Sequence, residues 1–190
     1  MTLIAKDICK SFGDKNVLQD LSHEFPDGSF TAVMGPSGCG KSTLLSILMG
    51  ILPPDSGSIE PDTEYRKSAV FQENRLCENL TAGANIRLVT GKRFSAAEIE
   101  KELDALGLQG CLNTPVKQLS GGMKRRVALL RALLAEYDVL FLDEPFKGLD
   151  EVTKTLVIER VKEKTAGRTV IMVTHDADEC SALAQNVIKM

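Results

Sequence analysis

Short apolar runs alternate with amphipathic stretches along the chain. Residues 3–12 and 16–25 combine apolar and β-branched side chains, and the second segment ends at the turn sequence PDGS, which favours two strands. FTAVM at 30–34 predicts a buried strand, and KSTLLSILMG at 41–50 predicts a helix closed by Gly50. We expect a loop at ILPPDSGSI, residues 51–59, and a second core strand at KSAVFQ, residues 67–72.

The pattern becomes helical from about Asn74 to Gln118. LTAGANIRLV and SAAEIEKELDALGL have helical periodicity, and Ser95 with Glu98 forms a capping box. We expect a helical insertion here. Together with the amphipathic helix predicted to begin at Gly121, it defines a helical subdomain of about 74–135 within one domain spanning 1–190.

The C-terminal third returns to alternating strands and helices. VLFLDE at 139–144 is a continuous apolar run, typical of a parallel sheet covered on both faces. A helix near 151–164, a strand at 168–174, a helix at 176–184 and a terminal NVIKM segment follow. This order predicts the α/β class with a mostly parallel core sheet.

Composition narrows the functional classes. The chain has 190 residues with 43% hydrophobic and 26% charged residues, enough for a sizeable core. Its net charge of −3 argues against an electrostatic grip on nucleic acid. The N-terminus lacks a signal-peptide pattern, and no apolar run approaches the roughly 20 residues of a membrane-spanning helix. Five scattered cysteines without a CxxC pair indicate reduced thiols of a cytosolic protein. A membrane role would therefore require a partner.

GPSGCGKST, residues 35–43, matches the phosphate-loop pattern GxxxxGK[ST] between a predicted strand and a predicted helix. The glycines allow successive backbone N–H groups to turn toward phosphate oxygens. Lys41 supplies a positive charge to the phosphates, and the Ser42 hydroxyl is placed for Mg²⁺. The predicted nucleotide-binding residues of the loop are Gly35, Pro36, Ser37, Gly38, Cys39, Gly40, Lys41, Ser42 and Thr43.

Two adjacent carboxylates end the apolar run at 139–144. Asp143 suits a Mg²⁺ shell, as the strand-end aspartate of P-loop NTPases does, and Glu144 suits the orientation of an attacking water. His175 and Gln72 each follow a predicted core strand. A lone histidine at a strand end is more often structural than catalytic, although at the end of a core strand it could reach a γ-phosphate. By itself, Gln72 is only a polar residue that leaves a sheet, with the same two readings.

A second candidate anion site lies at LSGGM, residues 119–123. Ser120 suits a helix cap, and two glycines strip the first helical turn of side chains. Such a turn presents free N–H groups and the positive end of the helix dipole.

With these motifs in this order, the chain resembles an ATP-binding-cassette ATPase, the nucleotide-binding subunit of an ABC transporter. The glycine loop matches the Walker A motif, VLFLDE the Walker B motif and LSGGM the family signature. Phe12 matches the aromatic residue that stacks on adenine, Gln72 the Q-loop glutamine, and His175 the switch histidine; GLD at 148–150 matches the D-loop with Asp150. The resemblance implies a P-loop NTPase fold with N-terminal antiparallel strands, ATP and Mg²⁺ as cofactors, and catalytic roles for Lys41, Glu144 and His175. It also implies a metal shell from Ser42, Gln72 and Asp143.

The resemblance also implies partners. Two cassettes, identical or different, would pack head to tail, so that Ser120, Gly121 and Gly122 hold the γ-phosphate of ATP bound to the partner chain. A separate membrane permease, served in an importer by a solute-binding protein, would place the dimer on the cytoplasmic face of the membrane, without nucleic acid. We expect the permease to dock on an apolar surface with a charged rim, made by Leu76, Leu80 and Ile86 with Glu73, Arg75 and Glu78.

Some features bear on the type of transporter. DEPFKGLD after the signature resembles importers of the nitrate, sulfonate and taurine type, whereas lipoprotein and macrolide exporters usually have threonine after DEP. The alternatives are an ABC ATPase acting on nucleic acid or the ribosome, and a soluble phosphotransferase. The run Met123, Lys124, Arg125, Arg126 departs from the usual glutamine before the arginine. The sequence ends soon after His175, so we expect no C-terminal regulatory domain and a short or poorly covered last strand.

Overall fold

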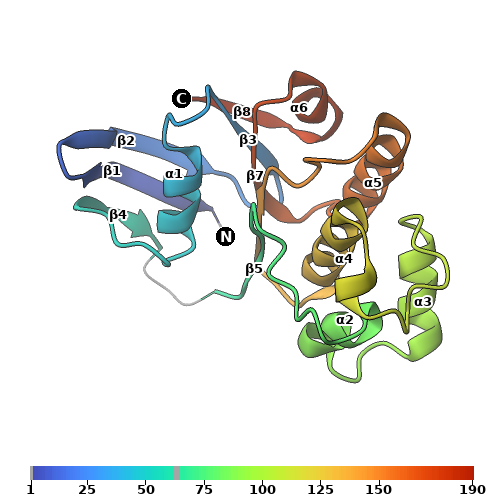
Figure 1. Ribbon diagram of the computed structural model, residues 1–190. Coiled ribbons are helices and arrows are strands. Elements are labelled where there is room, and N and C mark those ends of the chain that lie inside the picture. Colours follow the sequence, from blue (N-terminus) through green and yellow to red (C-terminus); the bar gives the residue numbers. More distant parts are fainter. Residues whose placement is uncertain (1, 62–64) are drawn as a thin grey trace.

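The computed structural model describes residues 2–61 and 65–190 and arranges them as two sheets with helices around them (Figure 1). The strands are β1 Leu3–Phe12, β2 Lys15–Phe25, β3 Phe30–Met34, β4 Ser56–Glu60, β5 Lys67–Val70, β6 Val139–Asp143, β7 Thr169–Thr174 and β8 Asn186–Lys189. The helices are α1 Lys41–Leu48, α2 Ala82–Thr90, α3 Ala96–Asp104, α4 Gly121–Leu134, α5 Glu151–Lys164 and α6 Ala177–Leu183, with a short 3₁₀ turn at Val116–Gln118.

The larger sheet is parallel and has the order β5-β6-β7-β3-β8. Its strands are buried on both faces, and neighbouring residues of β6 enter different cores. Leu140 and Leu142 pack with the α2–α6 helices, while Val139 and Phe141 pack with α1 and the smaller sheet. Burial on both sides explains the unbroken apolar run in the sequence. The predicted α/β fold with a mostly parallel core sheet is confirmed.

The smaller sheet is antiparallel, with the order β2-β1-β4. The sequence interpretation of residues 51–59 as a loop was wrong at its end, because β4 forms there and pairs with β1. Its Ser-Gly-Ser start does not alternate apolar and polar side chains, so the sequence lacks the two-residue pattern by which a strand is predicted. Gly57 has a φ of 90°, and a Cβ on it would lie 2.4 Å from the Asp7 carbonyl oxygen, so the close strand approach depends on glycine.

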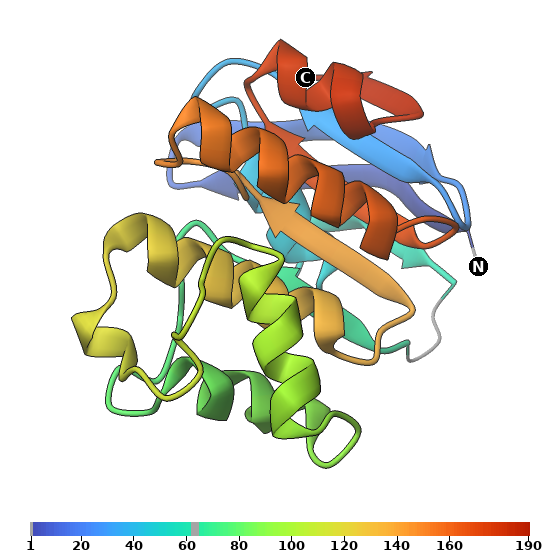
Figure 2. The same ribbon diagram turned by 90° about the vertical axis from the view of Figure 1, so that its right-hand side faces the viewer.

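Helices α2 and α3 pack against α4. Figure 2 shows α2 and α3 with the start of α4 gathered below α5, where α2 contacts both α3 and α4. The predicted capping box forms at the start of α3 between Ser95 and Glu98. One expectation fails here: Ile86, assigned to a docking surface, is fully buried. It lies in the same hydrophobic core as buried residues of α4, so it cannot form part of a docking surface.

Helices α4, α5 and α6 cover one face of the parallel sheet, and α1 lies on the other (Figure 1). None of the helices in the described ranges 2–61 and 65–190 is long and apolar enough to cross a bilayer. The last strand, β8, has four residues, of which one is buried. This agrees with the prediction of a short or poorly covered final strand. The carboxyl ends of β3, β6 and β7 meet at one edge, where the predicted motifs also lie.

Candidate active site

The glycine loop connects β3 to α1 and turns through two left-handed positions. Gly38 has a φ of 81° and Gly40 a φ of 105°, conformations that L side chains rarely adopt. A Cβ on Gly40 would also lie 2.9 Å from Val17 and Leu18 side-chain atoms. Lys41 Nζ donates to the carbonyl oxygens of Gly35 and Pro36, both at 2.8 Å. These two hydrogen bonds hold the lysine ammonium group against the start of the glycine loop, so its positive charge stays within the loop.

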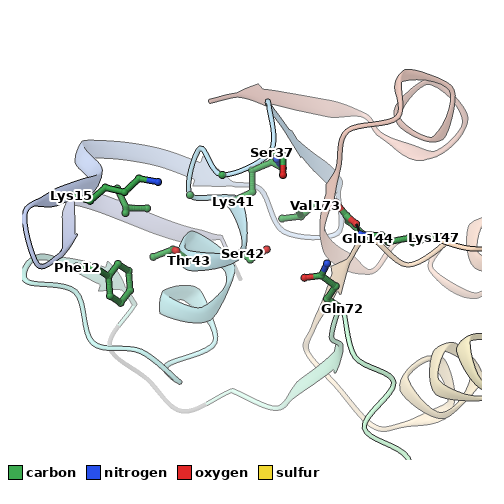
Figure 3. Close-up of a pocket in the computed structure, with 13 residues that line it drawn as sticks. Phe12, Lys15, Ser37, Lys41, Ser42, Thr43, Gln72, Glu144, Lys147 and Val173 are labelled. Carbon is green, nitrogen blue, oxygen red and sulfur yellow. Dashed lines mark ion pairs between the residues drawn. The ribbon is translucent and has the colours of Figure 1, made fainter.

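A pocket of about 420 Å³ lies in front of this loop. Figure 3 shows Phe12 and Lys15 at one end of it, the glycine loop along one side, and Gln72, Glu144 and Lys147 at the other end. Phe12 is 51% exposed at the end of β1, which leaves its ring free to stack on a flat ligand. The complete lining is Phe12, Lys15, Val17, Ser37, Gly38, Gly40, Lys41, Ser42, Thr43, Gln72, Glu144, Lys147 and Val173.

Asp143 ends β6 with only 8% exposure, and the Ser42 hydroxyl donates to its Oδ1 over 3.3 Å. Burial raises the pKa of Asp143, the hydrogen bond from Ser42 opposes this, and the neighbouring Glu144 charge raises it further. A buried carboxylate that is costly to ionise gains much from a cation. The described residues contain no cluster of three or more His, Cys, Asp or Glu side chains, but Mg²⁺ at phosphate sites typically takes one or two protein carboxylates. The donors Ser42 and Asp143 therefore fit Mg²⁺.

Glu144 follows with a φ of 46°, a strained conformation for a residue with a side chain. Its Oε1 lies 3.2 Å from His175 Nδ1, and its Oε2 lies 2.8 Å from Lys147 Nζ. The Lys147 interaction lowers the pKa of Glu144, burial opposes it, and His175 lowers it further. Adjacent carboxylates thus have opposite tendencies: Asp143 resists ionisation, while Glu144 favours it.

His175 is well exposed beyond the end of β7 and lines a smaller neighbouring pocket of about 200 Å³ with Glu144 and Lys147. The two pockets share Glu144 and Lys147. The histidine therefore contacts the strand-end glutamate from outside the main pocket.

The second glycine pair begins α4. Ser120 caps this helix, accepting a hydrogen bond from the Met123 N–H over 3.3 Å. A Cβ on Gly121 would meet no atom within 4 Å, and Ser120 and Gly121 are exposed. None of the residues 120–122 is among the described residues that line the main pocket. This helix start therefore lies outside the pocket formed by the chain's own glycine loop.

Asp150 caps α5 in a similar way and accepts a hydrogen bond from the Thr153 N–H over 3.0 Å. That bond lowers the pKa of Asp150. The residue is exposed, and it too lies outside the pocket lining.

The model of the family described as ABC transporter matches residues 18–147. The chain belongs to the ABC transporter family. Two curated relatives agree with this membership. The aliphatic sulfonates import ATP-binding protein SsuB 1 of Agrobacterium fabrum is 41% identical over 96% of this chain and 68% of its own length. The taurine import ATP-binding protein TauB of Jannaschia sp. is 37% identical over 94% of this chain and 71% of its own length.

Solved structures of this ABC family share the fold. The dimeric structure of MJ0796, a bacterial ABC transporter cassette, aligns with a TM-score of 0.84 at 27% identity, covering 99% of this chain and 94% of that one. The post-hydrolysis dimer of the same cassette, bound to ADP and Pi, aligns equally well. The chain is an ATP-binding ATPase of the ABC type, as the motif order predicted.

The structure brings most of the sequence-predicted site together. One group shares the pocket or touches a pocket residue: Phe12, Ser37, Gly38, Gly40, Lys41, Ser42, Thr43, Gln72, Asp143, Glu144 and His175. Gly35 and Pro36 contribute their carbonyls to Lys41, and Cys39 is half-buried within the same loop. A second group, Ser120, Gly121, Gly122 and Asp150, lies apart from it.

Sequence reasoning missed four pocket residues, Lys15, Val17, Lys147 and Val173. Lys147 carried a usable signal, because it stands three residues after Glu144 on the tight turn that leaves β6. Lys15 and Val17 come from the start of β2, whose position across the pocket depends on pairing with β1. That placement is tertiary and leaves no mark in local sequence.

Proposed function

We propose that this chain supplies the energy for an importer: it binds and hydrolyses ATP and drives a separate permease in the membrane. The observation that carries the proposal is the meeting of Ser42 and Lys41 with Asp143 and Glu144 at one pocket. Relatives named as import subunits for aliphatic sulfonates and taurine support small sulfonates as the cargo. They also favour an importer over an ABC ATPase that acts on nucleic acid or the ribosome.

ATP binds with its phosphates on the loop at residues 35–43 and its adenine against Phe12. Backbone N–H groups of the left-handed turns and the N-terminus of α1 attract the phosphate oxygens. Lys41 exchanges the carbonyls of Gly35 and Pro36 for the phosphates, a stronger charge-assisted interaction. Stacking on Phe12 contributes about 1–3 kcal/mol if base stacking on aromatic side chains is a guide.

Ser42, Asp143 and Gln72 are the residues that would hold Mg²⁺. Ser42 and Asp143 are already within hydrogen-bond distance of each other, and Figure 3 shows the Gln72 side chain extending toward Ser42. When bound, the metal would neutralise charge on the phosphate oxygens. The positive charge of the metal would offset the free-energy cost of burying the ionised Asp143 carboxylate. Because Gln72 would bind the metal that accompanies ATP, the position of its side chain would depend on whether nucleotide is bound.

Glu144 orients the attacking water and accepts its proton. Its Oε2 is buried and has no well-oriented hydrogen-bond donor among the described residues, although Lys147 forms an ion pair with it. An acceptor with a free lone pair beside a phosphate site is suited to hold water. His175, 3.2 Å from Oε1, fixes the other carboxylate oxygen and can reach toward the γ-phosphate.

The nucleotide site is completed by a second cassette packed head to tail, either a second copy or a related chain. Ser120, Gly121 and Gly122 of each chain bind the γ-phosphate held by the other, and Asp150 lies in the same interface. The exposure of Ser120, Gly121 and Asp150, the glycine-rich start of α4 and the position of these residues outside the pocket lining support this arrangement. A closed twofold arrangement of such surfaces yields two sites per dimer.

The helical subdomain, about 74–135, receives the permease. This docking holds the dimer on the cytoplasmic face of the membrane, and a solute-binding protein delivers the cargo from the other side. The exposed apolar residues Leu80, Leu88 and Val89 on and before α2 support this surface. We assign no nucleic-acid partner.

Uptake in reconstituted vesicles tests the proposal. The chain is assembled with a candidate permease, and taurine and an alkanesulfonate are offered with a matching solute-binding protein. We expect ATP-dependent accumulation, lost in Lys41→Ala. Uptake that persists in Lys41→Ala, or ATPase activity without any accumulation of either solute, would refute the importer assignment.

A further inference from the structure

Arg125 is a buried cation in the first turns of α4, the helix that starts at Gly121. The residue is only 4% exposed. Among the described residues, its hydrogen-bond acceptors are backbone carbonyl oxygens and one amide oxygen, and no carboxylate accepts from it directly. Burying a charge in this way is costly unless several oriented dipoles compensate. Because burying this charge is costly, we infer that an arginine is needed at this position.

One edge of the guanidinium holds the exit of β6. Nη2 donates to the carbonyl oxygens of Asp143 and Glu144, both at 2.6 Å, and Nε donates to that of Pro145 at 3.0 Å. Three consecutive carbonyls thus converge on one planar group. The fork of five fixed N–H donors makes arginine suited to this task.

The other edge holds the exit of the neighbouring strand, β5. Nη1 donates to the carbonyl oxygen of Phe71, with longer contacts of 3.4 Å to the Gln72 carbonyl and the Asn74 amide oxygen. Strands β5 and β6 pair in parallel up to Val70 and Leu142. Beyond those residues the chains separate, and Arg125 bridges them.

The held segment includes the strained residue Glu144. Its N–H donates to the Val173 carbonyl over 2.9 Å, and its own carbonyl accepts from Arg125. Both sides of a left-handed residue are therefore fixed, one by β7 and one by α4. A conformation of this kind persists only where its surroundings determine it.

We propose that Arg125 is a positioning residue that links the start of α4 to the backbone of Glu144 and Gln72. A displacement of the glycine turn at 120–122 moves Arg125 with the same helix and shifts the carbonyls at 71 and 144 together. The position of the signature turn thereby governs the aim of the Glu144 carboxylate. This inference rests on the proposed role of Glu144 in hydrolysis.

The test compares Arg125→Gln and Arg125→Lys with wild type. Glutamine keeps a hydrogen-bond donor but loses the positive charge and the planar guanidinium. Lysine keeps the positive charge but has a single ammonium group in place of the planar guanidinium. Affinity for a fluorescent ATP analogue should stay within about threefold, because the glycine loop is untouched. The turnover number should fall about 10²-fold in Arg125→Gln, since small misplacement of a reacting group costs that much, and by less in Arg125→Lys.

Arg131→Gln is the matched control. Arg131 lies on the same helix and also donates to a loop carbonyl, that of Arg75 at 3.0 Å, but it does not touch the exit of β6. Its turnover should stay near wild type. If Arg131→Gln and Arg125→Gln lower turnover equally, or if Arg125→Gln keeps wild-type turnover, the positioning role is refuted.

A double-mutant comparison separates positioning from loss of fold. In a Glu144→Gln background, Arg125→Lys should cause no further loss of turnover, because the group that it aims is already gone. An additional, independent loss would overturn the proposal. If Arg125→Gln fails to fold, Arg125→Lys alone decides between these outcomes. If Glu144→Gln itself hydrolyses ATP at the wild-type rate, the role proposed for Glu144 fails instead, and the two failures remain distinct.

Discussion

At the scale of single residues, adjacent carboxylates do different work because their surroundings differ. Asp143 is nearly enclosed and faces Ser42, and burial raises its pKa. Glu144 turns the other way through a positive φ and meets Lys147 and His175. One residue is thus suited to a metal ion and the other to a water. The backbone reversal at Glu144 produces this division.

Glu144→Gln tests the division. The amide keeps the shape of the side chain but removes the proton acceptor. Hydrolysis should fall by about 10²–10⁴, the usual contribution of a positioned general base, while ATP still binds. Steady-state ATPase measurement and ATP-analogue binding report the two effects. A variant that hydrolyses ATP near the wild-type rate would show that Glu144 is not the base.

Cys39 offers a second test within the glycine loop. It is half-buried, with Sγ 3.8 Å from Lys41 Nζ, so an adduct there would occupy the phosphate site. We expect a maleimide to inactivate the enzyme and MgATP to protect it, with Cys39→Ser active and resistant. Cys77→Ser, which removes an exposed thiol elsewhere, should remain sensitive. Inactivation that persists in Cys39→Ser would assign the effect to another cysteine.

At the scale of elements, an ion cluster joins helix α3 to helix α5. Glu102 on α3 pairs with Lys164 on α5 at 2.6 Å and with Arg160 on the same helix. All three side chains are largely buried. Burial works to raise the pKa of Glu102, but the hydrogen bonds from Lys164 and Arg160 prevail and lower it.

Glu102→Gln should therefore lower the free energy of unfolding by about 1.5–3 kcal/mol at neutral pH, the range for hydrogen bonds to charged groups. A carboxyl whose pKa is lower in the folded state contributes stability above its unfolded pKa and loses it as the pH falls through the folded value. The difference from wild type should thus be constant at pH 6–8 and shrink below the ordinary glutamate pKa of 4.5.

Urea unfolding at several pH values measures this effect. The exposed Glu100→Gln on the same helix serves as the control and should change stability little. A Glu102→Gln penalty that stays the same down to pH 3 would show that the carboxylate charge is not the cause.

The surface around α2 carries the proposed permease contact. Leu80 is 38% and Leu88 59% exposed, whereas Leu76 packs against the core. We expect Leu80→Asp and Leu88→Asp to keep the ATPase activity of the isolated chain and to lose transport or assembly in the complex. Ile51→Asp, an exposed apolar site just beyond α1, is the control and should transport normally. Normal transport by both α2-region variants would remove the docking surface.

These elements also show what local sequence can reveal. The glycine loop, the apolar strands and the cap of α4 were predictable, because each depends on a short pattern with a direct backbone cause. Ile86, Arg125 and β4 were not. In MKRRVALL both arginines look like solvent-facing charges, yet packing of α4 against the ends of β5 and β6 buries Arg125. The pairing of β4 with β1 requires glycine at position 57, because a side chain there would clash with the backbone of β1. This requirement cannot be inferred from the sequence of β4 alone.

At the scale of the whole molecule, each nucleotide-binding motif occurs once in the sequence, and these motifs lie in two separate places. The pocket contains the loop and the strand ends, while the start of α4 is exposed outside it. A glycine-rich helix start without a ligand on its own chain has unused N–H groups. We propose that head-to-tail pairing joins each of these two places with the complementary place on the partner chain.

Complementation by mixing tests that claim most directly. Lys41→Ala damages the loop half, and Ser120→Arg blocks the α4 half, so each variant alone should be inactive, with circular dichroism to verify that it is folded. Mixed in equal amounts, they form some dimers in which one site carries both lesions and the other carries neither. We predict partial recovery of ATPase activity on mixing. A mixture as inactive as its components, although it forms mixed dimers on ATP addition, would contradict the shared site.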